Sequence, residues 1–405
     1  MKDYTDLDFE RNVEMRLLMM CIVFVPDEKV QEEISKLLEQ PIRWDLFYQL
    51  VIKNRVWPLV YKNLNHCINK AENPVFLRIE NQYKRSQLSS LLLVKELIIV
   101  MEYFNKHDIK AISVKGPLLA KSLYGDIAMR ASRDLDILVP ISELQKVDDL
   151  LSRMNYVKDE PIEHLTNRQE RYIINTFHHY SYHNSSGVQL EIHWRLSTDY
   201  DKITFEEIWK NRREVFLFGR KMNVLGEEEN LAYLILHGSK HGWKRIRWLC
   251  DVKELLKDQK IDREKFEKRC RELKILHLVE QTYFLFHVVF QSEDKSGLRL
   301  SGHKRAVGKR LAKQSAPFLW SVDEEAELYQ HPLYGSYKRY MLTWNQGILK
   351  KMKYLMGHFK PTTEDFKLNE IEDRYFFLYY FFRLRRMGKR CIHIIGNKLV
   401  FHKNR

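Results

Sequence analysis

Two aspartates separated by one apolar residue, Asp134 and Asp136, are the residues of this chain whose spacing most clearly suggests chemistry. Residues 133–139 read as a strand, on which alternate side chains point the same way, so both carboxylates share one face. Two like charges this close repel each other, and each resists ionisation. A bound divalent cation removes that conflict. The pair therefore predicts part of a magnesium site.

A third acid, Glu191, stands in a second strand-like stretch, residues 188–194. Alternation there turns the apolar side chains inward, namely Val188, Leu190, Ile192 and Trp194. The opposite face then carries Gln189, Glu191 and His193. Carboxylates on adjacent strands suit a pair of magnesium ions, which prefer oxygen ligands together with phosphate oxygens. We therefore expect Glu191 to lie beside Asp134 and Asp136.

The elements that must position these acids follow from the spacing of apolar residues and turn residues. Helical spacing predicts helices over residues 10–25, 30–38, 45–54 and 76–107. The next section predicts a strand at 109–114, a helix at 118–124, a strand at 134–139, a helix at 141–154, and a hairpin of 177–183 with 188–194. Further helices are predicted at 227–241, 244–256, 262–271 and 276–290, followed by a helical tail with loops near Pro317, Pro332 and Pro361.

This order of elements predicts an α+β fold, with a small mixed β-sheet core and helices on one face. We expect an N-terminal helical segment over 1–107, a catalytic core over 108–225 and a C-terminal helical domain over 226–405. At 405 residues the chain is long enough for such an arrangement.

Composition excludes several classes of protein. The 44% hydrophobic and 30% charged residues are typical of a globular protein, and the net charge of +14 favours acidic partners such as nucleotides. Five scattered cysteines without a CxxC pair argue for a reduced, cytoplasmic protein. The apolar run at 17–25 lacks a basic leader, and the aromatic run at 375–382 is too short to cross a bilayer, so no transmembrane segment is expected. An aromatic run followed by arginines leaves an interfacial membrane helix as the alternative to a packed helix.

Three linked motifs resemble the nucleotidyltransferase superfamily. They are residues 115–130 (KGPLLAKSLYGDIAMR), 133–139 (RDLDILV) and 190–194 (LEIHW). The chain more narrowly resembles a poorly characterised bacterial branch, some of whose members are encoded beside peptide natural-product genes. Residues 237–251 (HGSKHGWKRIRWLCD) and 361–365 (PTTED), with the aromatic helix after them, also resemble that branch. The resemblance spans roughly residues 50–390.

The resemblance implies that Asp134, Asp136 and Glu191 hold two Mg²⁺ ions, with Mn²⁺ as an alternative, and that Glu191 also helps deprotonate the acceptor. An NTP is the implied co-substrate, and pyrophosphate leaves as the acceptor attacks the α-phosphorus. Gly116 would let backbone N–H groups approach the triphosphate. Lys115, Arg130 and Arg133 would contact its β- and γ-phosphates, and Arg133 has the alternative role of neutralising the acids.

The sequence departs from the superfamily pattern at the phosphate turn. Gly116 is followed by Pro117 where Gly-Ser or Gly-Gly is usual, and proline removes one N–H donor. The gap from Gly116 to Asp134 is also longer than in the commonest members.

Several basic residues on the later helices have two interpretations each. Lys240, His241 and Lys244 are expected to face the sheet and contact the acceptor or triphosphate. A zinc site at His237 and His241 lacks the third ligand and the glutamate of a metalloprotease helix. Arg247 and Asp251 read as a plain ion pair within one helix.

On the strand before Glu191, His179 and His183 share one face and His178 lies opposite, so a solvated hairpin and an acceptor contact are both open.

We therefore expect a metal-dependent nucleotidyltransferase that moves a nucleoside monophosphate from an NTP to a hydroxyl or phosphate of a small molecule, sugar or peptide. Two alternatives remain. One is an RNA-tailing or other template-independent polymerase, for which the basic charge would serve although no RNA-binding module is recognisable. The other is a nucleotide-binding protein with little catalysis, favoured by the Gly116-Pro117 turn.

Overall fold

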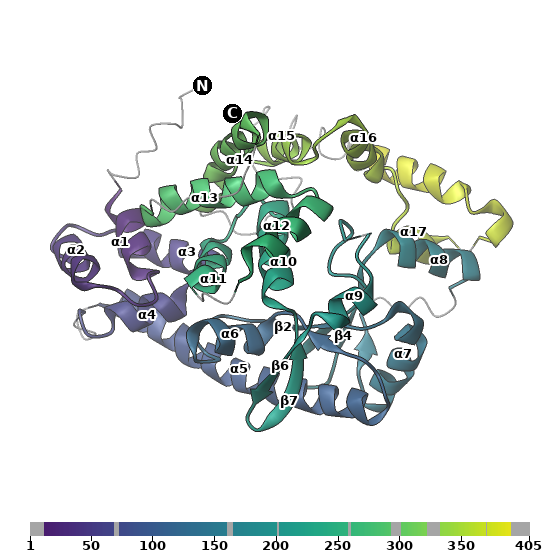
Figure 1. Cartoon of the computed structure of the whole chain (residues 1–405), viewed down its shortest axis with the longest axis horizontal. Helices are drawn as coiled ribbons and strands as arrows, with labels where there is room; N and C mark the ends of the chain where they lie inside the picture. The colour runs from purple at the N-terminus through teal and green to yellow at the C-terminus, as the bar shows by residue number, and fades with distance from the viewer. Residues whose placement is uncertain are drawn as a thin grey trace, which may run out of the picture.

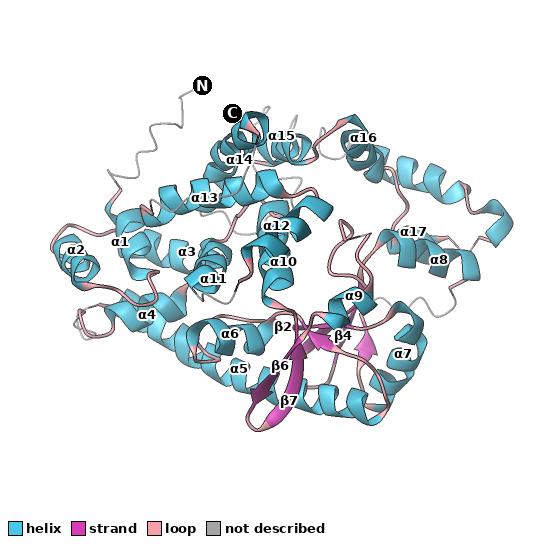
Figure 2. Cartoon of the chain, in the orientation of Figure 1, coloured by secondary structure: helices cyan, strands magenta, loops and turns pink. Residues whose placement is uncertain are grey.

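Seven strands form one mixed sheet in the order β3-β4-β5-β2-β1-β7-β6 (Figure 2). The computed structural model describes residues 12–68, 73–159, 165–200, 202–257, 261–292, 301–321, 333–369 and 371–389. The strands are β1 (Ile112–Ser113), β2 (Asp134–Leu138), β3 (Val157–Lys158), β4 (His179–His183), β5 (Gln189–His193), β6 (Arg213–Leu217) and β7 (Arg220–Val224). β2 runs parallel to β5, and this pairing sets Asp136 directly beside Glu191.

The sheet has a buried apolar face and a polar face. Leu135, Ile137, Leu190 and Ile192 are at most 1% exposed, as the alternation of both stretches predicts. They pack in one hydrophobic cluster with side chains of α5 (Pro74–Lys106) and α7 (Leu144–Arg153). Figure 1 shows α5 running along the length of this part of the molecule. The side chains between the apolar ones, Asp136 and Glu191 among them, therefore face the other way.

In the view of Figure 1, the N-terminal helices lie to the left of this sheet and the helices that follow it lie mostly above it. Those before it are α1 (Val13–Cys21), α2 (Glu28–Leu38), α3 (Trp44–Asn54) and α4 (Trp57–Leu64). The helices that lie between strands in the sequence are, besides α7, α6 (Gly116–Tyr124), α8 (Asn167–Thr176) and α9 (Phe205–Lys210). Those after it are α10 (Glu227–Lys240), α11 (Ile246–Lys257), α12 (Arg263–Glu272), α13 (Leu276–Phe290), α14 (Gly302–Trp320), α15 (Tyr334–Trp344), α16 (Ile348–Gly357) and α17 (Thr363–Leu368). Residues 378–389 are also helical.

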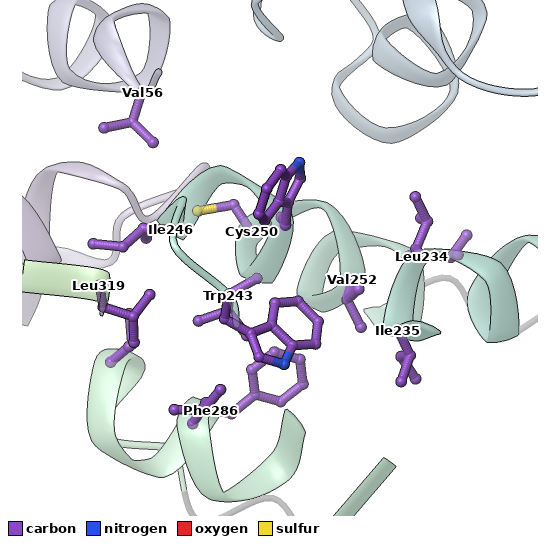
Figure 3. Close-up of a cluster of buried hydrophobic side chains, with 14 of the residues drawn as sticks. Val56, Leu234, Ile235, Trp243, Ile246, Cys250, Val252, Phe286 and Leu319 are labelled. Atoms are coloured by element: carbon purple, nitrogen blue, oxygen red, sulfur yellow. The ribbon is translucent and has the colours of Figure 1, made fainter. Parts of the chain in front are cut away.

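Trp243, in the turn between α10 and α11, is fully buried in the largest hydrophobic cluster. Figure 3 shows its indole near Ile246, Phe286 and Leu319, which come from three different helices. Gly238 makes room for the indole, because a Cβ there would lie 2.4 Å from a ring carbon of Trp243. The same cluster includes side chains of α1, α3 and α4, so the N-terminal helices and the later helices share one core. The expected domain boundaries stay a prediction.

The last described part of the chain returns to the sheet, where it contacts α8 beside α17 (Figure 1). The Gln169 side chain donates to the Tyr379 hydroxyl at 2.7 Å, and the Tyr172 hydroxyl donates to the Pro361 carbonyl at 3.1 Å. A small apolar cluster joins Trp194 at the end of β5 to Phe366 and Tyr379. In the described residues, no helix is long and apolar enough to cross a membrane.

The structure confirms the α+β fold and the hairpin of β4 with β5, and it corrects several elements. The predicted helix 10–25 is observed as Val13–Cys21, with residues 1–11 outside the described part. Pro317, predicted to lie in a loop, lies inside α14 close to its end. Pro332 falls outside the described residues. The sequence reading also did not name α4, α8, α9 or the β6–β7 hairpin.

Candidate active site

A cavity of about 400 Å³ lies between the polar face of the sheet and helices α10 and α11. All but one of the expected site residues line it: Lys115, Arg130, Arg133, Asp134, Asp136, Glu191, Lys240, His241 and Lys244. The exception, Gly116, begins α6 just beside the cavity. The acids come from the sheet, whereas Lys240, His241 and Lys244 come from α10 and the turn after it. The structure therefore gathers residues that lie far apart in the sequence around one cavity.

Asp136 is the most enclosed of the three acids, at 4% exposed. The Lys115 Nζ lies 3.5 Å from its Oδ1, and the His193 Nε2 lies 3.0 Å from the same oxygen. Burial by itself raises the pKa of Asp136, but Lys115 and His193 lower it well below its usual range. Asp136 is therefore ionised. Lys115 lies close enough to offset part of its negative charge, which a bound cation would also offset.

His193 lies between two carboxylates. Its Nε2 is 3.0 Å from the Asp136 Oδ1 and 3.1 Å from the Glu191 Oε2. Burial lowers the pKa of His193, yet these two contacts raise it on balance. The alternation on β5 places His193 on the same face as Glu191, but sequence reasoning assigned it no role. The signal for such a role was its position two residues after Glu191, which places both side chains on the same face of a strand.

The three acids are not equivalent. Ligand atoms of Asp136, Glu191 and His193 all lie within 4.8 Å of one another, which is close enough to hold a single ion. Asp134 lies on the same face at the start of β2 and is not part of that group among the described residues. Burial and the charge of Asp136 raise the pKa of Asp134. Converging, ionised carboxylate oxygens fit a divalent cation, since hard cations prefer oxygen ligands.

The turn before α6 has the backbone expected for a phosphate turn. Gly116 has a φ of +65°, and Pro117 follows in the first turn of the helix. A Cβ at Gly116 would lie 3.7 Å from the Asp134 carbonyl oxygen, an ordinary contact. The left-handed backbone, rather than lack of space, is therefore what requires glycine here.

Gly116→Ala is expected to lower the free energy of unfolding by about 1–2 kcal/mol, because an L-residue is strained in this conformation. Urea unfolding measures the change. Gly335→Ala is the matched control, since Gly335 lies in α15, has no positive φ and leaves open space within 4 Å of the point where a Cβ would lie. An equal loss in both variants would contradict the assigned strain.

Arg130 and Asp251 form a buried ion pair that the sequence did not predict. The Arg130 Nε donates to the Asp251 Oδ2 at 2.9 Å, and the Tyr124 hydroxyl donates to the other carboxylate oxygen at 3.1 Å. Arg130 therefore lines the cavity while already bound to an acid. The expected pair of Arg247 with Asp251 was wrong in this respect, because Asp251 is taken by Arg130 and the Arg247 guanidinium donates to the Ala131 carbonyl.

Arg247 is consequently a buried cation without an ion-pair partner of its own in the described part of the chain. Its side chain lines the cavity, the residue is 8% exposed, and its Nε has no hydrogen-bond partner among the described residues. Burial and the neighbouring Arg130 lower the pKa of Arg247 to about 9. A buried guanidinium on a cavity wall, without a salt bridge of its own among the described residues, is the arrangement that an anionic ligand would complete.

The helical wall of the cavity also contains three aromatic rings in contact and a lysine held by hydrogen bonds and an ion pair. His237 and His241 pack against Trp248, with ring centroids 5.2 and 5.5 Å from the indole. Lys240 donates to the Ser197 and Thr198 hydroxyls at 3.2 and 3.0 Å and pairs with Asp199 at 3.0 Å. His237 and His241 do not belong to either group of possible metal ligands found in the described residues.

The three histidines before Glu191 are arranged differently from the prediction. His178 and His179 both line the cavity, whereas His183 is exposed and contacts Asp159. The expectation that His178 lies opposite His179 was wrong, because β4 begins only at His179 and strict alternation does not extend to the residue before it. Burial lowers the pKa of His178 to about 2, so its ring is neutral.

Comparison with known proteins supports the nucleotide-transfer interpretation of this geometry. Residues 40–291 match the model of a family described as uncharacterised nucleotidyltransferase. No curated protein matches the chain. The C-terminal motif at 361–365 lies beyond the matched region and stays a prediction. Because the match includes all three acids and more than half of the 405 residues, the chain belongs to this nucleotidyltransferase family and is a transferase.

Proposed function

We propose that the protein transfers a nucleoside monophosphate from an NTP to a hydroxyl or phosphate of a small molecule, sugar or peptide, with release of pyrophosphate. The observation that carries the proposal is the register of β2 with β5, which places Asp136 beside Glu191 on the floor of a cavity whose other wall is basic. Such a division suits a triphosphate that needs metal-bound acids at one end and cations at the other.

The acids would hold the metal. Asp134, Asp136 and Glu191 supply the carboxylate oxygens for two Mg²⁺ ions, or for Mn²⁺, which when bound neutralise charge on the phosphates. Burial raises the pKa of Glu191, but the hydrogen bond from His193 lowers it on balance, so Glu191 is ionised. We infer that Glu191 accepts the proton of the acceptor hydroxyl while the acceptor oxygen forms a bond to the α-phosphorus. The bond from the α-phosphorus to the bridging oxygen breaks, and pyrophosphate leaves.

Arg247 is the residue that we assign most firmly to the phosphates. Asp251 is paired with Arg130, and Arg247 lines the cavity without a salt bridge of its own among the described residues, so an anion in the cavity would give its charge a direct partner. Arg133 is exposed and lines the same cavity, and we expect it to reach the outer phosphates. Lys115 is held by Asp136, which makes it a group that bridges the acids and the phosphate end.

Arg247→Met is expected to weaken NTP binding by about 10–100-fold, the effect of losing a charged hydrogen bond worth about 1.5–3 kcal/mol. The same change should not lower the free energy of unfolding, because it removes a buried charge and replaces it with an apolar side chain. Calorimetric titration with NTP and chemical unfolding measure the two effects.

Arg271→Met is the matched control, because Arg271 lies half-exposed on α12, paired with Glu267. It should leave NTP affinity unchanged. An Arg247→Met protein with unchanged affinity, or one that is strongly destabilised, would show that the guanidinium has a structural role only.

The direct test is to incubate the protein with ATP, CTP, GTP or UTP, Mg²⁺ and a cell extract as a source of acceptors. Pyrophosphate release together with an acceptor heavier by one nucleoside monophosphate is the expected result. A ladder of extended RNA would identify an RNA-tailing enzyme instead. Tight NTP binding without pyrophosphate would identify a binding protein, and either outcome would overturn the proposal.

A further inference from the structure

Three imidazole rings gather on one wall of the cavity, beside the acids. The ring centroids of His178 and His179 are 4.5 Å apart, those of His179 and His193 are 5.0 Å apart, and those of His178 and His193 are 5.7 Å apart. One ligand atom from each residue lies within 4.8 Å of the others. The carboxylate site does not use His178 or His179, and His193 has its Nδ1 in addition to the Nε2 that contacts the acids.

The backbone fixes this arrangement. His179 and His193 are direct partners in the antiparallel pairing of β4 with β5. His178 is held one residue earlier, because the Trp194 N–H donates to its carbonyl at 3.1 Å. Paired side chains on neighbouring strands keep a constant spacing, so the sheet positions the rings of His179 and His193. The backbone hydrogen bond from Trp194 holds His178 directly before β4.

The rings have unused polar atoms. The Nδ1 atoms of His179 and His193 are buried and have no hydrogen-bond partner in the described part of the chain. His193 is only 3% exposed, so its Nδ1 is a buried polar atom whose lost hydration is not replaced by a hydrogen bond among the described residues. A ligand in the cavity that binds nitrogen would replace that lost hydration.

We propose that His178, His179 and His193 bind one transition-metal dication of the zinc class on the cavity wall. Imidazole nitrogen suits Zn²⁺ and Co²⁺, whereas Mg²⁺ prefers oxygen. Three histidines that face a cavity leave a further coordination position open, as catalytic zinc sites do. Glu191, whose Oε1 lies 3.9 Å from the His179 Nε2, supplies negative charge next to the ion. This site does not depend on nucleotide transfer.

The test uses the full-length protein, stripped of metal and titrated with Co²⁺ in excess Mg²⁺ and without NTP. Nitrogen-bound Co²⁺ in a site of low coordination number absorbs visible light much more strongly than the octahedral aqueous ion. Wild-type protein should develop these bands with about one equivalent of Co²⁺, and Zn²⁺ should displace the ion and raise the melting temperature.

The double variant His178→Gln with His179→Gln should lose the bands, with Co²⁺ affinity lower by more than about 100-fold, since even a partner that only orients a ligand contributes 10–100-fold. His183→Gln is the matched control, from the same strand but exposed, and should bind Co²⁺ as wild type does. His178→Gln alone replaces the double variant if that protein does not fold.

Asp134→Asn separates this site from the carboxylate site, because it alters an acid without touching an imidazole. The Co²⁺ bands should persist in it. Bands that vanish in Asp134→Asn but survive in the histidine variants would place the ion on the acids, and wild-type protein without bands would leave no nitrogen site. Either result overturns the proposal, whatever the outcome of the pyrophosphate assay.

Discussion

Asp136→Asn is expected to reduce pyrophosphate release by at least about 10²–10³-fold, the scale on which loss of one group that stabilises transition-state charge acts. The substitution keeps the size of the side chain but removes the charge that Lys115 and His193 share. It therefore removes a metal ligand and leaves Lys115 and His193 without this carboxylate partner. The loss is measured as pyrophosphate release from NTP with the acceptor found in the extract assay.

The control for Asp136→Asn is Asp149→Asn, an exposed aspartate on α7 that accepts a hydrogen bond from Gln145 at 3.2 Å. It should retain full activity. Circular dichroism and melting separate a catalytic loss from unfolding. Substantial activity in a folded Asp136→Asn protein would contradict the assigned metal site and the mechanism built on it.

Trp243→Ala is expected to lower the free energy of unfolding by about 3–5 kcal/mol, because it empties the centre of the largest hydrophobic cluster. Gly238, which faces the indole, has no side chain that could fill the cavity left by Trp243. Trp243→Phe should cost much less, because the indole Nε1 has no hydrogen-bond partner among the described residues to lose. Guanidinium unfolding measures all three proteins.

Trp209→Ala is the comparison for this prediction. Trp209 is half-buried on α9, with its ring stacked on Phe205 at 5.8 Å and covered by the Arg212 guanidinium at 3.9 Å. Its removal leaves an opening to solvent rather than a cavity, so the loss should be clearly smaller. Equal losses in the two alanine variants would show that the cluster around Trp243 is not the centre of stability.

The acids were predictable because their environment is local in sequence. Alternation of two on β2 and on β5 identifies the polar face, and burial of Leu135 and Leu190 follows from the same pattern. That β5 lies beside β2 was inferred from the acids themselves. The register of Asp136 with Glu191 confirms this pairing. The long helix α5 was also predictable, because its apolar stripe continues over many turns.

The partner of Asp251 was not predictable from local sequence. Asp251 is four residues from Arg247, so helical spacing pairs them, yet Arg130, 121 residues earlier, forms the ion pair with the carboxylate.

The β6–β7 hairpin was missed for another reason. Its turn uses Phe218 and Gly219, both with positive φ, where Asn-Gly is the usual signal. Pro317 predicts a loop because proline usually ends or kinks a helix, yet α14 continues past it to Trp320.

The acids of the cavity lie on the sheet and Arg247 lies on the opposite helix α11, and this placement has a consequence for the whole molecule. Any triphosphate that contacts Asp136 and Arg247 together ties the strand β2 to the helix α11. The substrate then acts as a cross-link between two layers, and by mass action each tenfold rise in its concentration above the dissociation constant adds about 1.4 kcal/mol to the stability of that junction. The residues from 227 to 257 should accordingly resist proteolysis in proportion to nucleotide occupancy.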